Sequence, residues 1–337
     1  MIISRVAYPR AGLIGNPSDG YFGKTIAFTF RNFRAEVVLY ETPEIEILPN
    51  TRDHSRFDSL EHLADDVRRF GYYGGIRLLK AACKRFHDYC RATSARLDGR
   101  TFTIRYRSDI PHQVGLAGSS AIITAGFRAL MAFYGVDIPK PILANLVLSV
   151  ETEELGISAG LQDRVVQAYQ GVVFMDFDRA LMERQGHGRY EPMDPALLPP
   201  LYIAYRADLS EGSEVFHNDV RARWNRGEPE VVAAMKRWAE LAERARGVLL
   251  AGRPGDLGPL LDANFDLRRR IYRISPGNVA LVETARSVGA SAKFTGSGGA
   301  IVGTCPDDAT FEALRRALEP LGAQVLRPDI APGDDRP

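Results

Sequence analysis

Pro111-His-Gln-Val-Gly-Leu-Ala-Gly-Ser-Ser-Ala-Ile122 is the stretch that decides how the rest of the chain is understood. A strand-like run, Thr101–Arg107, leads into it, and a helix-like run, Ala121–Tyr134, follows it. Its glycines and serines therefore stand where a loop turns into a helix, and glycine lets the backbone approach a ligand closely. Because the first N–H groups of a helix lack internal partners and favour an anion, the stretch predicts a phosphate-binding site.

A plainer interpretation fits the same residues. Ser119 and Ser120 can cap the helix after a glycine-rich turn, or either hydroxyl can reach a metal ion. Short motifs also match by chance, and the Gly-Lys-Ser/Thr ending of the usual P-loop is missing. The stretch alone leaves the phosphate site and the capped turn both open.

The composition is that of an ordinary globular protein. The chain has 337 residues, 45% of them hydrophobic and 25% charged, a length that suits two domains. A net charge of +1 gives no field for nucleic acid or an anionic membrane, and no window approaches the ~20 apolar residues of a membrane span. The N-terminus is too polar for a signal peptide. The three cysteines lack disulfide or metal spacing, which favours reduced thiols in the cytoplasm: Cys83, Cys90 and Cys305.

The segment Pro9–Gly23 holds four glycines and two prolines between two strand-like runs, Met1–Tyr8 and Lys24–Phe33. This composition predicts a shaped loop without regular structure. The loop is either a site candidate or a solvated turn, and its polar residues include Arg10, Asn16 and Asp19.

The remaining pattern predicts an α+β fold. Strands are expected over residues 34–39, 44–48, 171–177, 201–205, 300–305 and 324–330. Helices are expected over residues 72–86, 141–151, 161–169, 217–224, 230–250, 257–272, 278–288 and 311–318. The charged stretch 53–66 is expected to begin as an exposed segment and to become helical towards its end. We place a domain boundary at Pro199-Pro200, which gives an N-terminal domain 1–198, a C-terminal domain 199–331 with helices on one face of its sheet, and a frayed tail 332–337.

Asp163 stands in the first turn of the helix expected over 161–169. A carboxylate there can accept a proton or hold a cation, although the residues alone equally fit a partner for the helix dipole. A second glycine loop, Lys293–Thr304, precedes the strand near the C-terminus.

Three of these segments, in this order, resemble the motifs of the GHMP small-molecule kinases, which include galactokinase, homoserine kinase, mevalonate kinase and phosphomevalonate kinase. They are Arg10–Gly23, Pro111–Ala121 and Lys293–Ala300. The resemblance implies a two-domain fold with an N-terminal ribosomal protein S5 domain 2-like part and a C-terminal ferredoxin-like α/β sandwich. It implies ATP and Mg²⁺ as cofactors, with the nucleotide phosphates bound by Pro111, Gly115, Leu116, Ala117, Gly118, Ser119, Ser120 and Ala121.

The resemblance also implies roles for single residues. Asp163 matches the carboxylate that acts as base or electrostatic partner for the acceptor hydroxyl, and Arg10 matches the basic residue between that hydroxyl and the γ-phosphate. Ser120 and Glu151 match the Mg²⁺ ligands. Asp19 matches a carboxylate that binds sugar hydroxyls, and the third motif shapes the substrate site through Gly296 and Gly298.

Within the family, further segments look like those of the glucuronokinases: Gly12–Gly23, Glu154–Arg164, Asn264–Arg269 and Ala292–Ala300. Galactokinases have an acidic residue where this chain has Asn16. A missing negative charge beside the sugar fits an anionic substrate, because a carboxylate there would repel a uronate. A uronate needs a bidentate partner, and five arginines are candidates that the sequence does not rank: Arg164, Arg221, Arg223, Arg268 and Arg269. Arg164 fits equally well as an ion-pair partner of Asp163.

The resemblance therefore implies an ATP- and Mg²⁺-dependent sugar 1-kinase that phosphorylates the anomeric hydroxyl of a uronic acid, D-glucuronate above all. A kinase for a neutral sugar, a heptose phosphate or a small alcohol stays open, as does a non-catalytic sensor of ATP and sugar. The expected protein is a cytoplasmic monomer or homodimer that binds ATP and a small sugar acid, without nucleic acid or membrane.

Overall fold

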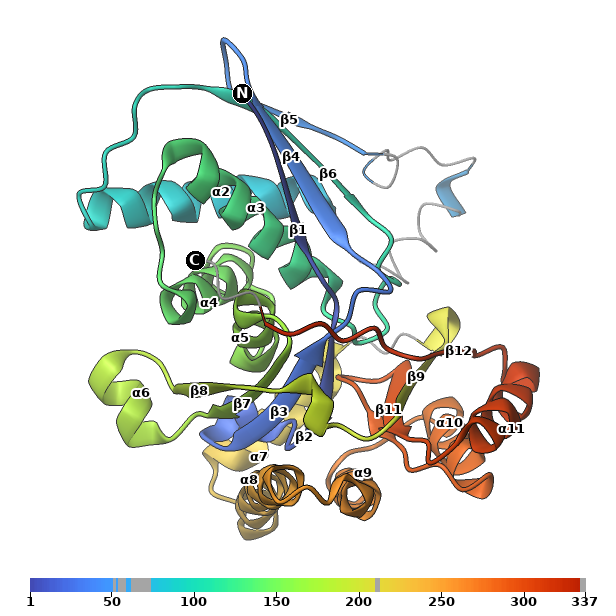
Figure 1. Ribbon diagram of the computed structural model, residues 1–337. Helices are drawn as coiled ribbons and strands as arrows, with labels where there is room; N and C mark the ends of the chain where they lie inside the picture. The colour runs from blue at the N-terminus through green and yellow to red at the C-terminus, as the bar shows by residue number, and fades with distance from the viewer. Residues whose placement is uncertain (51–52, 54–58, 62–73, 210–212, 334–337) are drawn as a thin grey trace.

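The computed structural model describes residues 1–50, 53, 59–61, 74–209 and 213–333, and of residues 213–218 only the backbone is considered. Three four-stranded sheets are stacked along the molecule, with helices between and around them (Figure 1). The α+β class expected from the sequence is confirmed. The expected stretch 53–66 and the start of the expected helix 72–86 lie largely outside the described residues.

The first sheet has the order β1-β4-β6-β5. Its first three strands are antiparallel, and β5 runs parallel to β6. The residues of β4 alternate between buried and partly exposed, as a strand with one covered face requires. The elements are β1 (Ile2–Ala7), β4 (Ala35–Glu41), β5 (Glu46–Leu48) and β6 (Phe102–Ser108), with α2 (Gly75–Ala92) and α3 (Gly118–Tyr134) packed on one side in Figure 1.

The second sheet corrects the expected loop Pro9–Gly23. Arg10–Ile14 is a strand, β2, with all five residues buried, and only the remainder of the segment is irregular or 3-10 helical. Gly12 allows this, because a Cβ there would lie 2.7 Å from the carbonyl oxygen of Thr295. The sheet has the order β2-β3-β7-β8, with β3 (Lys24–Thr29), β7 (Val172–Asp176) and β8 (Arg189–Met193).

Helices from both halves of the chain cover this second sheet. In Figure 1 α5 lies above it and α8 below it, and both pack against β3. Before α5 the chain forms α4 and then a short π-helical turn. The sequence predicts a single helix over 141–151 in place of these two elements. These elements are α4 (Lys140–Ser149), the turn Val150–Glu154, α5 (Leu161–Tyr169), α6 (Arg179–Gln185) and α8 (Pro229–Leu250).

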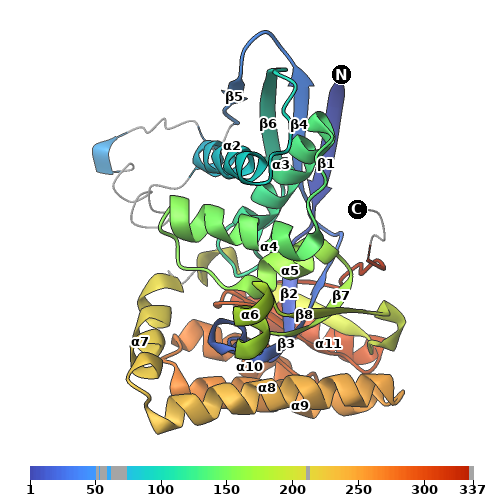
Figure 2. The ribbon, with the colours of Figure 1, turned by 90° about the vertical axis from the view of Figure 1, so that its left-hand side faces the viewer.

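The third sheet is antiparallel and has the order β10-β11-β9-β12. It consists of β9 (Leu201–Tyr205), β10 (Lys293–Phe294), β11 (Ala300–Thr304) and β12 (Gln324–Leu326). The other helices of this half are α7 (Ser213–Asn225), α9 (Leu257–Ile271), α10 (Pro276–Ser287) and α11 (Asp308–Leu318). Helices α8 and α9 lie side by side in Figure 1, and α8 runs along the bottom of the molecule in Figure 2.

The chain end returns to the N-terminal half. The segment after β12 crosses the molecule towards α5 in Figure 1, and Arg31 pairs with Asp329 at 2.9 Å. The domain division at 198/199 stays a prediction, and residues 334–337 of the expected tail lie outside the described residues. Cys83, Cys90 and Cys305 are free thiols. Within the described ranges, no helix combines the length and the apolar character that a membrane span requires.

Candidate active site

The three motifs meet at one backbone carbonyl, that of Gly115. Arg10 at the start of β2 donates from Nη1 to this oxygen at 2.5 Å, and the Thr295 hydroxyl donates to it at 3.1 Å. Gly115 has φ +70°, and a Cβ on it would lie 2.9 Å from the Gly298 carbonyl oxygen. A glycine is therefore required where the second and third motifs touch.

Arg10 and Asp163 form a two-point ion pair beside this junction. Nε of Arg10 donates to Oδ1 of Asp163 at 2.5 Å, and Nη2 donates to Oδ2 at 2.9 Å. Burial alone would raise the pKa of Asp163, but the charges of Arg10 and Arg164 outweigh it and hold that pKa below its ordinary value. Asp163 is therefore ionised at neutral pH, and the two residues predicted to act on the transferred group are in contact.

A second ion pair adjoins the first. Arg164 donates from Nη1 to Asp163 at 3.1 Å, and from Nε to Oε2 of Glu151 at 2.8 Å. Its guanidinium is buried and also donates to the Gly160 carbonyl. Of the two roles considered for Arg164, the structure contains the ion pair. Its assignment to a substrate carboxylate stays a prediction, and in this structure its donors are engaged by Glu151, Asp163 and Gly160.

The hydroxyl that contacts Glu151 is that of Ser119. Ser119 Oγ donates to Oε1 of Glu151 at 2.7 Å, whereas Ser120 is fully buried and donates to the Ala117 carbonyl at 3.2 Å. The resemblance named Ser120 with Glu151 as the Mg²⁺ ligands, which stays a prediction; the serine whose hydroxyl contacts Glu151 in this structure is Ser119. The physical reason is the direction of the first helical turn, which turns Ser120 towards the protein interior.

The N-terminus of α3 fits an anion. Ala117 precedes the helix in the left-handed conformation, φ 59°, and makes no side-chain cap, so Ser119 and Ser120 lie within the first turn and neither is its N-cap residue. Gly118 begins the helix, and Pro111 lies partly exposed at the entrance of the preceding loop. The side chains of Leu116 and Ala121 are buried, so these two residues can offer a phosphate only their backbone.

The donor set also fits a magnesium ion that contacts a nucleotide. Mg²⁺ is usually held by one or two carboxylates together with phosphates and water. Glu151 and Ser119 supply one carboxylate and one hydroxyl next to the start of α3. Across the described ranges there is no group of three or more His, Cys, Asp or Glu side chains able to hold a metal.

Asn16 faces a buried lysine. Lys293 is 1% exposed, and its ammonium donates to Oδ1 of Asn16 and to the Gly12 carbonyl, both at 2.6 Å. Burial, with the positive charges of Arg268 and Arg10, holds the pKa of Lys293 well below its ordinary value. Asn16 is thus an uncharged partner for a lysine. Lys293 begins the third motif, and nothing in the local sequence indicated this contact with Asn16.

Asp19 belongs to the short 3-10 helix Ser18–Tyr21 and lies close to Asp163 of α5. Its Oδ2 accepts the backbone N–H of Gln162 at 3.4 Å. Burial and the charge of Asp163 raise the pKa of Asp19 to about 6. The side-chain oxygen of Gln162 is buried and has no hydrogen-bond partner within the described residues. Both oxygens suit the hydroxyls of a sugar, and nothing in the local sequence indicated Gln162.

Arg268 organises the third motif. It donates to the carbonyls of Gly296 at 2.9 Å and Ser297 at 3.1 Å, and it stacks over Phe294. Gly298 follows with φ +153°, next to the Gly115 junction. The predicted residues Gly296 and Gly298 thus lie at the Gly115 junction, and the guanidinium of Arg268 donates to carbonyls of the same loop. Contact of Arg268 with a substrate stays a prediction.

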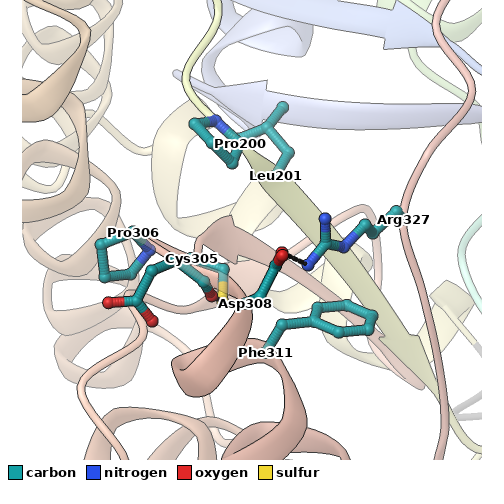
Figure 3. Close-up of a pocket in the computed structure, with 8 residues that line it drawn as sticks. Pro200, Leu201, Cys305, Pro306, Asp308, Phe311 and Arg327 are labelled. Atoms are coloured by element: carbon teal, nitrogen blue, oxygen red, sulfur yellow. Dashed lines mark hydrogen bonds and ion pairs between the residues drawn. The ribbon is translucent and has the colours of Figure 1, made fainter.

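A separate cavity of about 290 Å³ lies between the start of β9, the end of β11 and α11 (Figure 3). Arg327 lies there over the Phe311 ring at 4.4 Å and pairs with Asp308. None of its lining residues belongs to the network around Gly115, so this cavity takes no part in the chemistry described above.

Comparisons with known proteins agree with this arrangement. The model of the GHMP kinases N terminal domain matches residues 77–171, and that of the GHMP kinases C terminal domain matches residues 232–322. The chain is 45% identical to glucuronokinase 1 of Arabidopsis thaliana, over 98% of this chain and 92% of that protein. It is 44% identical to the probable glucuronokinase 2 of the same plant, over 89% and 84%. The solved structure of a Lin0012 protein from Listeria innocua superposes with a TM-score of 0.79 at 13% identity, covering 99% of each chain.

Proposed function

The chain belongs to the GHMP kinase family, and on that premise we propose that it transfers the γ-phosphoryl group of ATP to the anomeric hydroxyl of D-glucuronate. The identity of 45% with a glucuronokinase over almost the whole chain carries this proposal. Its site supports it, because every group that phosphoryl transfer requires has a candidate in the network around Gly115. We expect a cytoplasmic enzyme that is a monomer or a homodimer.

Asp163 orients the acceptor. The anomeric hydroxyl donates a hydrogen bond to its carboxylate, and its oxygen attacks the γ-phosphorus while the bond from that phosphorus to the β,γ-bridging oxygen breaks and its electron pair leaves with ADP. As the new bond forms, the hydroxyl proton passes to the Asp163 carboxylate and from there to solvent. A general base works best with a pKa near the operating pH, and the pKa of Asp163 is lowered. Orientation and stabilisation of the positive charge that develops on the attacking oxygen are therefore its main contribution.

Arg10 and the start of α3 receive the negative charge of the phosphates. Arg10 holds Asp163 from one side and faces the Gly115 junction from the other, so its guanidinium stands between acceptor and phosphates. The N–H groups of residues 118–120 offer donors to the phosphate oxygens. Glu151 and Ser119 would hold Mg²⁺, which when bound to ATP neutralises the phosphate charge. Ser120 stays a predicted ligand that this geometry favours less.

The surroundings of Asp19 suit an acidic sugar. Asp19 and Gln162 offer oxygens to ring hydroxyls next to Asp163. Asn16 and Lys293 occupy the neighbouring position without adding a negative charge. A uronate is therefore spared the repulsion that an acidic residue at position 16 would cause.

The test is ADP release from Mg-ATP with a panel of acceptors: glucuronate, galacturonate, glucose, galactose, arabinose, fucose, mevalonate and homoserine. We expect turnover with glucuronate, little with its C4 epimer and none with the last two. Asp163→Asn, purified in parallel, reports any contaminating kinase. Turnover confined to neutral sugars would contradict the proposed substrate and keep the kinase. ATP binding without turnover on any acceptor would contradict the activity itself.

A further inference from the structure

The proposed substrate poses a geometric question. In the pyranose ring of a uronate, C1 with the anomeric hydroxyl and C5 with the carboxylate are both bonded to the ring oxygen, so the carboxylate lies on the other side of that oxygen from the reacting hydroxyl. If Asp163 holds that hydroxyl, the group that binds the carboxylate lies in the same part of the site, on the ring-oxygen side of the sugar. An arginine is the side chain best suited to a carboxylate.

Four of the five candidate arginines are engaged elsewhere. Arg164 is held by Glu151 and Asp163, and Arg268 by two carbonyls of the third motif. Arg269 pairs with Glu283 at 2.7 Å on the surface. Arg223 pairs with Glu228 at 2.8 Å and has Asp219 and Glu230 within 4 Å. The remaining candidate, Arg221, forms no ion pair with any carboxylate of the described residues.

Arg221 is nevertheless held in a defined place. It projects from α7 and donates from Nη1 to the Gly20 carbonyl at 2.7 Å. Its guanidinium lies over the ring of Tyr21 at 4.2 Å, and Tyr21 in turn packs edge-on against Trp224 of the same helix at 5.1 Å. These contacts fix the plane of the guanidinium and leave Nη2 and Nε without an acceptor among the described residues. A fixed, exposed and uncompensated guanidinium is a carboxylate-binding group.

The position follows from the site. Asp163 adjoins Gln162, whose N–H binds Asp19, and Asp19 is followed by Gly20, which holds Arg221. The Tyr21 hydroxyl lies in the fields of both Arg221 and Asp19, while burial raises its pKa and keeps it a neutral hydrogen-bond donor. Arg221 is thus a positive charge beside Asp19, which in turn is connected to the neighbour of Asp163 in the chain.

We propose that Arg221, seated on Tyr21, binds the substrate carboxylate and selects uronates over neutral sugars. This inference rests on the proposed function and deepens it. Asp19 supplies the neighbouring contacts to the ring, and the Tyr21 hydroxyl donates to the second carboxylate oxygen.

The test is steady-state kinetics of Arg221→Gln with glucuronate. A charged hydrogen bond to a carboxylate corresponds to a loss of ~10–100-fold, which we expect as a rise in KM for glucuronate. The kcat, the KM for ATP and the Tm should stay near the wild-type values, because Arg221 is exposed and lies away from the transferred group. Arg221→Lys keeps the positive charge but not the planar pair of donors. Its KM for glucuronate should therefore lie between those of the wild type and Arg221→Gln.

Arg226→Gln is the matched control, because Arg226 is also exposed, follows α7 directly and pairs only with Glu228 among the described residues. Its KM for glucuronate should stay within about twofold of wild type. An unchanged KM in Arg221→Gln, an equal change in both variants, or a loss of kcat alone would overturn the inference while leaving the proposed function intact. A wild-type enzyme without uronate turnover would overturn the proposed function, and this inference with it.

Discussion

Two neighbouring regions of the site use charge in opposite ways. The transfer centre, which we define as Arg10, Ser119, Glu151, Asp163 and Arg164, pairs each of its charges inside the protein. The acceptor end, which we define as Asp19, Tyr21 and Arg221, holds one carboxylate and one guanidinium that form no ion pair within the described residues. The two regions adjoin through the contact between Gln162 and Asp19.

The difference separates transfer from selection. Buried ion pairs are rigid, because breaking one leaves an uncompensated charge in a low-dielectric surrounding. The transfer centre is therefore oriented before any substrate arrives, and it can act on any hydroxyl placed against Asp163. The acceptor end keeps its charges available for the ligand. Changes in the first region should remove turnover with every acceptor, and changes in the second should alter which acceptor is used.

The largest expected effect comes from Asp163→Asn, which keeps the shape of the side chain and removes its charge. We expect kcat to fall ~10²–10⁴-fold with every acceptor that the wild type uses. The same fall for glucuronate and for a neutral sugar would sharpen the separation between the regions. Asp88→Asn, in an exposed pair with Lys84, is the control and should change kcat less than about twofold. A kcat of Asp163→Asn within a few-fold of the wild-type kcat would contradict the role of Asp163 in the transfer centre.

A smaller effect is expected from the serines of the second motif. Because Ser119 rather than Ser120 contacts Glu151, Ser119→Ala should raise the Mg²⁺ concentration for half-maximal activity by about 10-fold, the lower range for loss of one metal-site contact. Ser120→Ala should leave it nearly unchanged. Titration of Mg²⁺ at saturating ATP measures both. A larger shift in Ser120→Ala would restore the assignment made from the resemblance and show that the loop rearranges when nucleotide binds.

The smallest expected effect concerns Asp19 and is a change in stability. Its pKa is raised from 3.8 to about 6 in the folded protein, so folding favours the protonated form. That contribution is complete below pH 3.8 and is lost as the pH rises through about 6. Asp19→Asn removes the ionised form, so its Tm should exceed that of wild type by about 2–4 °C at pH 8 and by less at pH 5.

Thermal unfolding at the two pH values measures this difference. Asp163 offers the internal contrast, since its lowered pKa keeps it ionised across the same window. A difference in Tm between wild type and Asp19→Asn that does not depend on pH would show that Asp19 lacks the unpaired charge on which the comparison depends.

The sequence predicted the regular elements well where a pattern was local. The helix Leu161–Tyr169 and the strand Leu201–Tyr205 have the bounds that their periodicity indicated. The strand Arg10–Ile14 was wrongly predicted as a loop, because its glycines and neighbouring prolines have the composition of a turn. What makes it a strand is pairing with β3 and contact with Thr295, a residue of the other half of the chain.

The resemblance to the family identified Arg10 and Asp163, and the structure brings the two into contact. The sequence did not reveal that Ser119 is the serine at Glu151, because the direction of a side chain depends on the left-handed turn at Ala117. Nor did it separate Arg221 from the other arginines. That distinction depends on the ion pairs of each arginine, which are formed by residues distant in the chain or on neighbouring helices.

The most direct test of the separation between transfer and selection is the Kd of glucuronate, measured by titration calorimetry in the presence of Mg-ADP. We expect Asp163→Asn to bind glucuronate within about threefold of wild type, since it loses at most one hydrogen bond to the reacting hydroxyl. We expect Arg221→Gln to bind it ~10–100-fold more weakly. Loss of binding in Asp163→Asn together with wild-type binding in Arg221→Gln would contradict the account.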